Sequence, residues 1–339
     1  MIARRDLGRT DLATSKVGFG AWSIGGTGWA FTGSADRDAG SIAAMLHAFD
    51  RGVNWVDTAP VYGQGHSEEL VGRALSLLHG DRPFVFTKCG RHWDGPDVPS
   101  RSDLRPEAIR ADCEGSLHRL GAEVIDLLQF HWPDKDTGVP LEESWGELLR
   151  LVEEGKVRAA GVCNFDQQLL ERCEAVGHVD SLQTPLSLIV RDSAGGLVQW
   201  CAAHDTAVIV YSPMQVGLLT DSFSADQIDR FEAADWRRSH PEFQAPNLER
   251  NLALRDALRP IAVAHSTTVA AVAVAWTLAW PQVTGAIVGA RTAEQVDGWI
   301  EGATLTLSRS DLDAIDAALV ATKAGSGPLS PEPPVPGLL

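Results

Sequence analysis

Four side chains suited to acid–base chemistry lie at or just after the ends of predicted β-strands. Asp57, Lys88 and His131 each end an apolar run, and Tyr62 follows Asp57 in the next loop. A tyrosine hydroxyl titrates near ~10, and a neighbouring lysine ammonium lowers that pKa by favouring the phenolate. Asp57 could keep Lys88 charged, and His131 could donate a hydrogen bond to a carbonyl oxygen. Brought together, these residues would make Tyr62 a general acid for a carbonyl that receives hydride.

The same residues also permit other interpretations. Asp57 and His131 could be structural hydrogen-bonding residues, and Lys88 could simply pair with Asp57. Lys88 at a strand end could also be the Schiff-base nucleophile of a lyase or aldolase. An ion pair with Asp57 disfavours Schiff-base formation, because a charged lysine is a poor nucleophile.

The elements that must bring these residues together are eight apolar runs that alternate with helical segments. Their continuous hydrophobicity suits parallel strands that are buried on both faces. The repeated alternation predicts a closed (β/α)8 TIM barrel in a single domain, with an open doubly wound sheet as the rival fold. In such a barrel the strand ends meet at one rim, where the site would form. The expected strands are Val17–Trp22, Val53–Thr58, Phe84–Lys88, Ile125–His131, Val157–Cys163, Ser181–Thr184, Ala207–Tyr211 and Gly285–Val288.

The intervening segments show the periodicity of amphipathic helices. Asp36 and Asp166 are predicted N-caps, and Pro106 is predicted to start its helix. The apolar stretch Val269–Trp280 is shorter than the roughly 20 residues of a membrane span, so we expect a buried helix there. The other expected helices are Ala35–Arg51, Ser67–Leu78, Pro106–Leu120, Leu141–Glu154, Gln167–Ala175 and Ala194–Ala203.

Two segments depart from this alternation. Residues 1–324 are predicted to form the barrel, with a long loop at 214–250 on the cofactor side. Loops of that length are usually functional or disordered. The proline-rich tail, residues 325–339, is predicted to run in an extended form over the surface.

The composition narrows the class of protein. The 339 residues are 44% hydrophobic, which allows one large core, and they carry a formal net charge of −16. An acidic chain repels phosphate, so we expect neither nucleic acid nor an anionic membrane as a partner. The polar start of the chain predicts no signal peptide. Scattered cysteines predict reduced thiols in a cytoplasmic protein and no metal site; they are Cys89, Cys113, Cys163, Cys173 and Cys201.

A hydride reaction needs a cofactor, yet the glycine patterns do not match a Rossmann fingerprint. Both Gly18–Ser23 and Gly63–Glu68 miss the third glycine, so barrel loops would have to hold a dinucleotide. Tyr211 could stack on a nicotinamide ring or be a plain core residue. Asn164 and Gln183 could hydrogen-bond the nicotinamide carboxamide.

A candidate anion site follows the last strand. Gly289 and Ala290 lead through Arg291 into a helix that begins near Thr292. Backbone N–H groups at the start of a helix, together with an arginine, favour a bound phosphate. Alternatively, Arg291 is a surface ion-pair residue.

Six motifs in order carry a resemblance to a known family. They begin at Asp57, Phe86, Gln129, Gly161, Tyr211 and Gly289, and they read DTAPVYG, FTK, QFHWP, GVCNF, YSP and GARTAEQ. From about Leu7 to Leu319 the chain resembles the aldo-keto reductase superfamily, and in particular its bacterial stress- or sugar-related members. The resemblance implies a (β/α)8 barrel that binds NADPH in an extended pose across the rim.

The resemblance also implies a role for each site residue. Tyr62 is expected to donate the proton, tuned by Lys88 and Asp57, while His131 orients the carbonyl. Arg291 is expected to meet the 2′-phosphate, which favours NADPH. The expected cofactor-binding residues are Ala21, Trp22, Asp57, Cys163, Asn164, Gln183, Tyr211, Ser212, Pro213, Met214, Gln215, Val216, Arg237, Gly289, Ala290, Arg291 and Gln295.

Within that set the resemblance assigns separate parts of the cofactor. Ala21 and Trp22 would approach the nicotinamide ribose, and residues 212–216 would follow the pyrophosphate. Gln295 would lie near the adenosine, and Arg237 would belong to a lid over the cofactor.

Three positions depart from the family pattern. Cys163 stands where serine is usual, and a thiol is a weaker hydrogen-bond donor. Val216 stands where many members have a basic residue, and Trp299 where an asparagine often contacts adenine. The proposed acid is unaffected by these departures.

The expected substrate is a small-molecule carbonyl compound or a sugar, reduced reversibly to an alcohol. Trp22, Trp93 and Trp132 are expected to line its pocket, because indole faces stack on sugars and aromatic aldehydes.

Besides a reductase and a lyase, a third possible function is that of a non-enzymatic NADPH-binding regulatory module, as some relatives are channel subunits. The sequence carries no signal for the oligomeric state.

Overall fold

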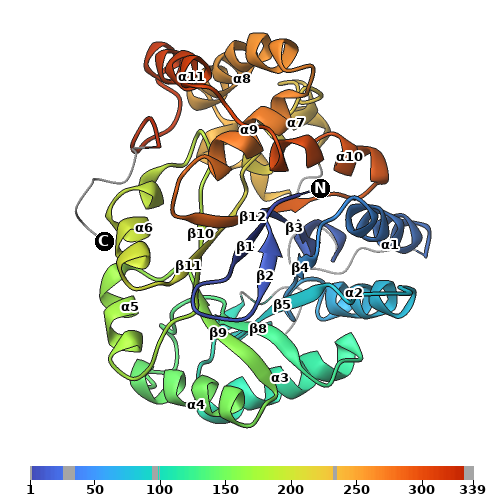
Figure 1. Cartoon of the computed structure of the whole chain (residues 1–339), viewed down its shortest axis with the longest axis vertical. Helices are drawn as coiled ribbons and strands as arrows, with labels where there is room; N and C mark the ends of the chain where they lie inside the picture. The colour runs from blue at the N-terminus through green and yellow to red at the C-terminus, as the bar shows by residue number, and fades with distance from the viewer. Residues whose placement is uncertain (1, 26–34, 94–97, 99, 232–234, 332–339) are drawn as a thin grey trace.

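The computed structural model describes residues 2–25, 35–93, 98, 100–231 and 235–331, and its centre is a closed parallel barrel. The barrel strands follow the order β10-β11-β12-β3-β4-β5-β8-β9, which confirms the predicted (β/α)8 barrel and rules out the open sheet. Figure 1 shows helices around this barrel. The barrel strands are β3 (Val17–Gly20), β4 (Trp55–Asp57), β5 (Phe84–Cys89), β8 (Ile125–Phe130), β9 (Val157–Cys163), β10 (Ser181–Pro185), β11 (Ala207–Tyr211) and β12 (Val283–Gly289).

The boundaries of six strands differ from the predicted ones, and the largest differences are at β3, β4 and β12. β3 ends at Gly20 rather than Trp22, because a 3-10 helix, η1 (Ala21–Ile24), begins directly after it. β4 is confined to the three residues that end at Asp57. β12 begins two residues earlier than expected, at Val283. Asp57 and Tyr211 end their strands as predicted, whereas β5 ends one residue after Lys88 and β8 ends one residue before His131.

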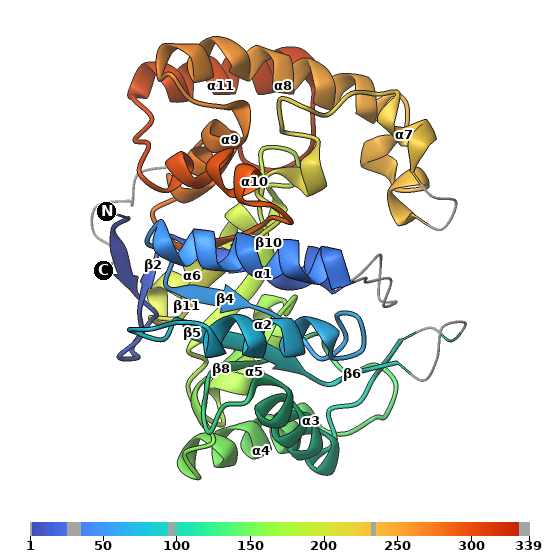
Figure 2. The same ribbon diagram turned by 90° about the vertical axis from the view of Figure 1, so that its right-hand side faces the viewer.

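An antiparallel hairpin precedes the barrel and was not predicted, because its strands are only three residues long. Its strands are β1 (Arg4–Asp6) and β2 (Ala13–Ser15). Leu7 and Leu12 on the hairpin are fully buried in one apolar cluster with Trp55 of the barrel interior. In Figure 2 the hairpin lies at one end of the barrel, while β6 (Arg91–His92) and α7 (Gln227–Arg230) project from the other. The hairpin thus fills the barrel end away from the proposed site.

Helices surround the barrel largely where the periodicity predicts them. Pro106 starts its helix, and the Asp166 side chain accepts a hydrogen bond from Leu169 N at 2.9 Å, as an N-cap does. Asp36 is not an N-cap but lies in the first turn of its helix. Among the described residues the α-helices are α1 (Ala35–Asp50), α2 (His66–Ser76), α3 (Pro106–Leu120), α4 (Leu141–Glu153), α5 (Gln167–Glu174), α6 (Gly196–Ala203), α7, α8 (Asn247–Ala264), α9 (Val269–Leu278), α10 (Ala293–Asp297) and α11 (Arg309–Thr322).

The apolar stretch after residue 268 is helix α9, and all ten of its residues are buried, as predicted. Within the described residues, no single helix has the length and apolarity of a membrane span. The joined pair α8 and α9 passes that test by length and composition, with a bend of 92° between the two helices. The helices α8 and α11 were not predicted, because their apolar residues are mixed with many charged ones.

The segment predicted as a long loop holds several short helices before α8 begins at Asn247. Residues 232–234 lie outside the described residues. Aromatic rings hold the segment together and join it to the barrel: Trp236 contacts Trp22 at 6.4 Å and Phe243 at 6.3 Å between ring centroids. The short elements are η3 (Gln215–Gly217), α7, η4 (Trp236–Arg238) and η5 (Pro241–Phe243).

Candidate active site

A buried lysine joins the aspartate and the tyrosine that the sequence singled out. Lys88 Nζ donates hydrogen bonds to Asp57 Oδ1 at 2.7 Å, to the Thr58 carbonyl at 2.9 Å and to Tyr62 Oη at 3.3 Å. Lys88 is 1% exposed and Asp57 is 3% exposed. The ammonium therefore has three acceptors in a site that is almost closed to water.

Neighbouring strands set this geometry. Asp57 ends β4 and pairs with Phe86 of β5, so Lys88 emerges two residues further along the same rim. The chain then turns back, with Thr58 N donating to Phe86 O at 2.9 Å and Tyr62 N donating to Ala59 O at 3.1 Å. These two backbone bonds bring the tyrosine ring over the lysine, whose Nζ lies 5.1 Å from the ring centroid.

The Tyr62 hydroxyl is a weaker acid than the sequence predicted. Burial raises the pKa of Tyr62 to about 12, because it penalises the phenolate more than the Lys88 ammonium stabilises it. The expected lowering by Lys88 is present but is outweighed, so the net prediction was wrong. A phenol that keeps its proton at neutral pH remains able to donate that proton.

Lys88 remains an ammonium group. Burial lowers the pKa of Lys88, but the Asp57 carboxylate and Tyr62 offset burial and raise the pKa above the ordinary lysine value. A Schiff base forms from a neutral amine, so this environment disfavours the lyase chemistry.

His131 faces Tyr62 at the same rim. The two rings meet edge to face with 5.7 Å between centroids, and His131 is 6% exposed. Burial and the Lys88 ammonium hold the pKa of His131 well below its usual range. The imidazole is therefore neutral at pH 7.

Burial of a neutral histidine makes stability depend on pH. Below about pH 6.5 the unfolded chain binds a proton at His131 that the folded protein does not, so stability falls by up to about 1.4 kcal/mol per pH unit. We expect His131→Asn to flatten this slope between pH 6.5 and 5, measured by urea unfolding. His79→Asn, at an exposed histidine, is the matched control and should keep the wild-type slope. An unchanged slope in the His131 variant would contradict the assignment.

A second layer of buried amides lies beneath the aspartate. Gln183 Nε2 donates to Asp57 Oδ2 at 2.8 Å and to Gln129 Oε1 at 3.4 Å. Gln129 Oε1 also accepts from Cys163 Sγ at 3.7 Å. Because the carboxylate can only accept, the Gln183 N–H groups must point into the barrel, which leaves its amide oxygen for another partner.

Gln129 is a site residue whose role the sequence reasoning missed. It is fully buried on β8, two residues before His131. The available signal was a polar amide inside an otherwise apolar strand, which must find hydrogen-bond partners in the barrel. Its contacts place it under the Asp57–Lys88 pair rather than at the open rim.

Asn164 and Tyr211 form a connected pair at the ends of β9 and β11. Tyr211 Oη donates to Asn164 Oδ1 at 2.8 Å, and Asn164 Nδ2 donates to the His131 carbonyl at 3.1 Å. Asn164 has a left-handed backbone with φ of 62°. The pair thereby links the predicted cofactor residues to the strand end that carries His131.

The chain after β11 has an unusual backbone. Ser212, Gln215 and Val216 have φ values of 58°, 46° and 53°, although none of them is glycine. Val216 is β-branched, and such residues rarely adopt this conformation. Pro213 is buried and Met214 is half-buried against the core. Strained backbone of this kind clusters at ligand-binding segments.

Charged residues gather where the last strand and the long segment meet. Arg237 donates to Asp235 through Nε at 3.0 Å and Nη2 at 2.6 Å, and its guanidinium lies 3.9 Å from the Phe231 ring centroid. The hydrogen bonds to Arg237 lower the pKa of Asp235, and Arg291 adds a smaller lowering. Gln295 Oε1 accepts from Arg291 N at 2.7 Å. Half-buried Arg237 therefore lies near the exposed residues Arg291 and Gln295.

The first and last barrel strands meet beside Trp22. Gly289 of β12 pairs with Gly20 of β3, and Ala290 is buried directly after it. Ala21 is fully buried, and its carbonyl accepts from Ser67 Oγ at 2.9 Å.

Two of the three predicted substrate tryptophans pack at the site. Trp22 and Trp93 lie against the cluster of Ala59, Val61 and Tyr62. Among the described residues, Trp132 is 41% exposed and does not belong to that cluster, although it directly follows His131. Trp22 and Trp93 thus pack against the cluster that contains the proposed acid.

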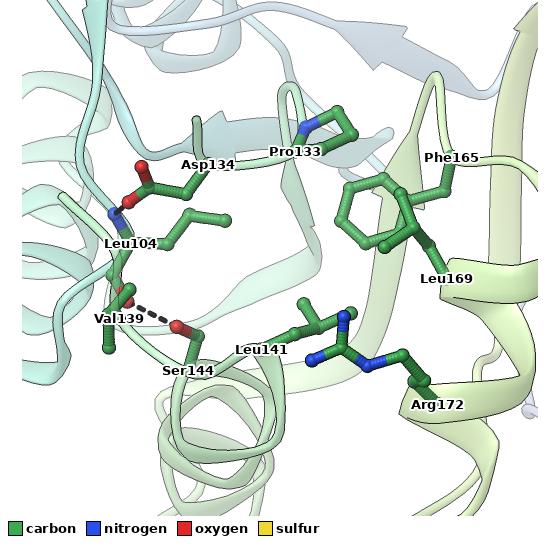
Figure 3. Close-up of a pocket in the computed structure, with 9 residues that line it drawn as sticks. All are labelled: Leu104, Pro133, Asp134, Val139, Leu141, Ser144, Phe165, Leu169 and Arg172. Carbon is green, nitrogen blue, oxygen red and sulfur yellow. Dashed lines mark hydrogen bonds between the residues drawn. The ribbon is translucent and has the colours of Figure 1, made fainter. Parts of the chain in front are cut away.

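A separate pocket of about 90 Å³ lies outside the barrel (Figure 3). Figure 3 shows Phe165 and Leu141 at this pocket, with Asp134 bonded to Leu104 N and Ser144 bonded to the Leu104 carbonyl. None of the four acid–base residues lines it.

The closed barrel and its buried lysine–tyrosine pair suit an enzyme that adds hydride to a carbonyl carbon and a proton to the carbonyl oxygen. The family model described as "Aldo/keto reductase family" matches residues 16–320. The chain belongs to the aldo/keto reductase family, and the predicted resemblance is confirmed.

Two curated relatives are similar over most of their length. The NADH-specific methylglyoxal reductase of Escherichia coli (strain K12) is 33% identical over 317 residues, covering 91% of this chain and 95% of that protein. The aldo-keto reductase YhdN of Bacillus subtilis (strain 168) is 33% identical over 325 residues, covering 95% of both chains.

Two solved structures share the architecture. A glycerol dehydrogenase from Gluconobacter oxydans is 35% identical, with a TM-score of 0.85 and coverage of 98% of both chains. An aldo/keto reductase from Klebsiella pneumoniae, solved in complex with NADP and acetate, is 26% identical, with a TM-score of 0.68. That match covers 95% of this chain and 96% of the other.

Proposed function

We propose that Tyr62 donates the proton when this aldo/keto reductase converts an aldehyde or ketone to an alcohol. The observation that carries the proposal is the buried Lys88 ammonium, which contacts both the Asp57 carboxylate and the Tyr62 hydroxyl. A bound reduced nicotinamide would supply the hydride. The phenol would then pass its proton to the carbonyl oxygen as negative charge develops there.

His131 would orient the substrate. Its neutral ring lies edge to face with Tyr62, so an imidazole N–H can donate to the same carbonyl oxygen that receives the proton. Trp22 and Trp93 would cover the other side of the carbonyl compound and exclude water. Asp57 holds Lys88 in place through the ion pair.

The rim residues fit a nicotinamide cofactor. The Gln183 amide oxygen and the Asn164 side chain would hold the carboxamide, and the Tyr211 ring would stack on the nicotinamide. The left-handed segment 212–216 would present backbone N–H groups to the pyrophosphate. These roles are supported by the hydrogen bonds that the Gln183 side-chain N–H groups donate to Asp57 and Gln129. Those bonds fix the orientation of the Gln183 amide.

We propose NADPH as the preferred cofactor, with Arg291 at the 2′-phosphate and Arg237 beside it. One relative is named for NADH and another was solved with NADP, so titration of this protein with both cofactors tests the preference.

Arg291→Leu is expected to raise the Kd for NADPH by about 10- to 100-fold, because a hydrogen-bonded charge contact contributes about 1.5–3 kcal/mol. The Kd for NADH should stay within about twofold, because NADH lacks the 2′-phosphate. Fluorescence titration of both cofactors measures the ratio. Arg309→Leu, which removes a surface ion pair with Asp313, is the control and should alter neither Kd. Equal losses for the two cofactors would place the 2′-phosphate elsewhere.

The proposed substrates are small polar carbonyl compounds, including sugar-derived ones. Support comes from the names of relatives that act on methylglyoxal and glycerol. Oxidation of NADPH and NADH should be followed with methylglyoxal, glyceraldehyde, glucose and benzaldehyde. Turnover of at least one carbonyl compound supports catalysis. Tight cofactor binding without any turnover would favour the regulatory module instead.

Borohydride trapping tests the lyase alternative. No adduct is expected at Lys88, because its amine stays protonated beside Asp57.

We propose the cytoplasm as the compartment. The five cysteines are buried free thiols, which supports this location.

A further inference from the structure

The C-terminal segment is bound to the loop that follows β10. Ser326 forms a parallel bridge with Val190. Ser326 N donates to the Ile189 carbonyl at 3.1 Å, and Arg191 N donates to the Ser326 carbonyl at 3.0 Å. The chain after α11 therefore pairs with residues 189–191 much as an added strand would.

A buried arginine of the loop, Arg191, holds the C-terminal segment in this pairing through hydrogen bonds. Arg191 is 3% exposed. Its Nε donates to the Pro328 carbonyl at 2.9 Å, and its Nη1 donates to the Ala324 carbonyl at 3.3 Å and to the Leu188 carbonyl. One guanidinium thus binds the C-terminal segment on both sides of Ser326, and it also binds the loop.

Glycine at two positions permits the close approach. Gly325 has a φ of +62°, and a Cβ there would lie 1.8 Å from the Ile189 carbonyl oxygen. Gly327 has a φ of +100°, and a Cβ there would lie 2.5 Å from Arg191 C. Any other residue at these positions would push the segment off the loop.

The same loop contacts the chain after β11. Ser187 Oγ accepts from Ile189 N at 3.1 Å and from Val190 N at 3.0 Å. The hydroxyl donates to Gln215 Oε1 at 2.9 Å. Ser187 is fully buried and Gln215 is 7% exposed, so this bond is shielded from water.

Gln215 belongs to a stretch whose backbone needs outside support. Its φ of 46° and the φ of 53° at Val216 are left-handed values that side-chain-bearing residues rarely adopt. Such conformations persist only where surrounding contacts impose them. The bond from Ser187 supplies one such contact, and Leu186 N adds another by donating to the Tyr211 carbonyl at 3.3 Å.

We infer that residues 325–328 act as a strap that positions the cofactor-binding segment 212–216 through the loop 187–191. Ser187 and Arg191 are positioning residues in this relay, and the ligand whose affinity they control is a dinucleotide pyrophosphate. The inference rests on the proposed function, which assigns residues 212–216 to the cofactor. The hydrogen bonds described for the strap join it to Ile189 and Arg191 and not to Tyr62, so we expect the strap to affect cofactor affinity and not the rate of the chemical step.

The test compares the full-length wild type with Ser187→Ala and Arg191→Lys. NADPH Kd is measured by fluorescence titration, and kcat and KM by NADPH oxidation. We expect Ser187→Ala to raise the NADPH Kd and KM by about 3- to 10-fold, the range that one hydrogen bond supports. The kcat at saturating NADPH should stay within twofold. Arg191→Lys should raise the Kd further, because a lysine cannot bind the carbonyls on both sides of Ser326.

Ser330→Ala is the matched control. Ser330 lies on the same C-terminal segment but bonds to Asp316 of α11 rather than to the loop. It should leave the NADPH Kd within twofold. A lower melting temperature in Ser187→Ala with an unchanged Kd would overturn the inference, because the strap would then be structural only. Should Arg191→Lys fail to fold, the Ser187 variant decides the question. Absence of NADPH and NADH binding in the wild type would refute the proposed function itself.

Discussion

Tyr62→Phe is expected to lower kcat for carbonyl reduction by about 10²- to 10⁴-fold, the contribution of a positioned general acid. The Kd for the cofactor should stay within about twofold, because the ring remains in its cluster with Ala59 and Val61. The lost group is the hydroxyl that lies 3.3 Å from Lys88 Nζ. Steady-state reduction of a carbonyl compound that the wild type turns over and fluorescence titration of NADPH measure the two quantities.

Tyr211→Phe is the matched comparison, because Tyr62 and Tyr211 are the two tyrosines of the chain. This variant loses the 2.8 Å hydrogen bond to Asn164 but keeps the ring. We expect a loss of only a few-fold, seen in the cofactor Kd rather than in kcat. Should Tyr62→Phe keep turnover within tenfold of wild type, the proton donor is another group.

Both predictions depend on a site that the sequence could locate but not fully describe. The ends of the apolar runs can be recognised in the sequence, and a closed barrel of parallel strands brings those ends to one rim. The prediction that Asp57, Lys88 and His131 lie together at that rim was therefore correct. The motif spacing also placed Tyr62 in the loop after β4. What the sequence could not show is how deeply the cluster is buried, and burial is what reverses the expected pKa shift of Tyr62.

Contacts between distant segments were also beyond the sequence. The hydrogen bond of Gln183 to Asp57 spans 126 positions, and the Ser187–Gln215 bond joins two different strand-end loops. A polar residue within an apolar run signals that some partner exists, as at Gln129, but it does not say which one. Short hairpins such as β1–β2 are not predicted for another reason, because a strand of three residues is too short to show a periodic pattern.

Loss of Lys88 from its ion pair with Asp57 is expected to lower both the stability and the activity of the protein. Lys88→Met is expected to lower the free energy of unfolding by about 3–5 kcal/mol, because it leaves the Asp57 carboxylate buried without its cation. Carbonyl reduction should also fall to background, since Tyr62 loses the neighbouring charge. Urea unfolding followed by circular dichroism measures the first effect. Lys156→Met, at a surface ion pair with Glu114, is the matched control and should leave the free energy of unfolding almost unchanged.

The double variant Asp57→Asn with Lys88→Met separates the structural role of the pair from its chemical role. Removing both charges eliminates the buried, uncompensated carboxylate, so most of the lost stability should return. Activity should not return, because a neutral pair cannot stabilise charge that develops on Tyr62 during proton transfer. A double variant that recovered both stability and turnover would show that the pair only fills space in the barrel. Recovery of stability alone is the expected result, because Lys88 contacts the proton-donating oxygen itself.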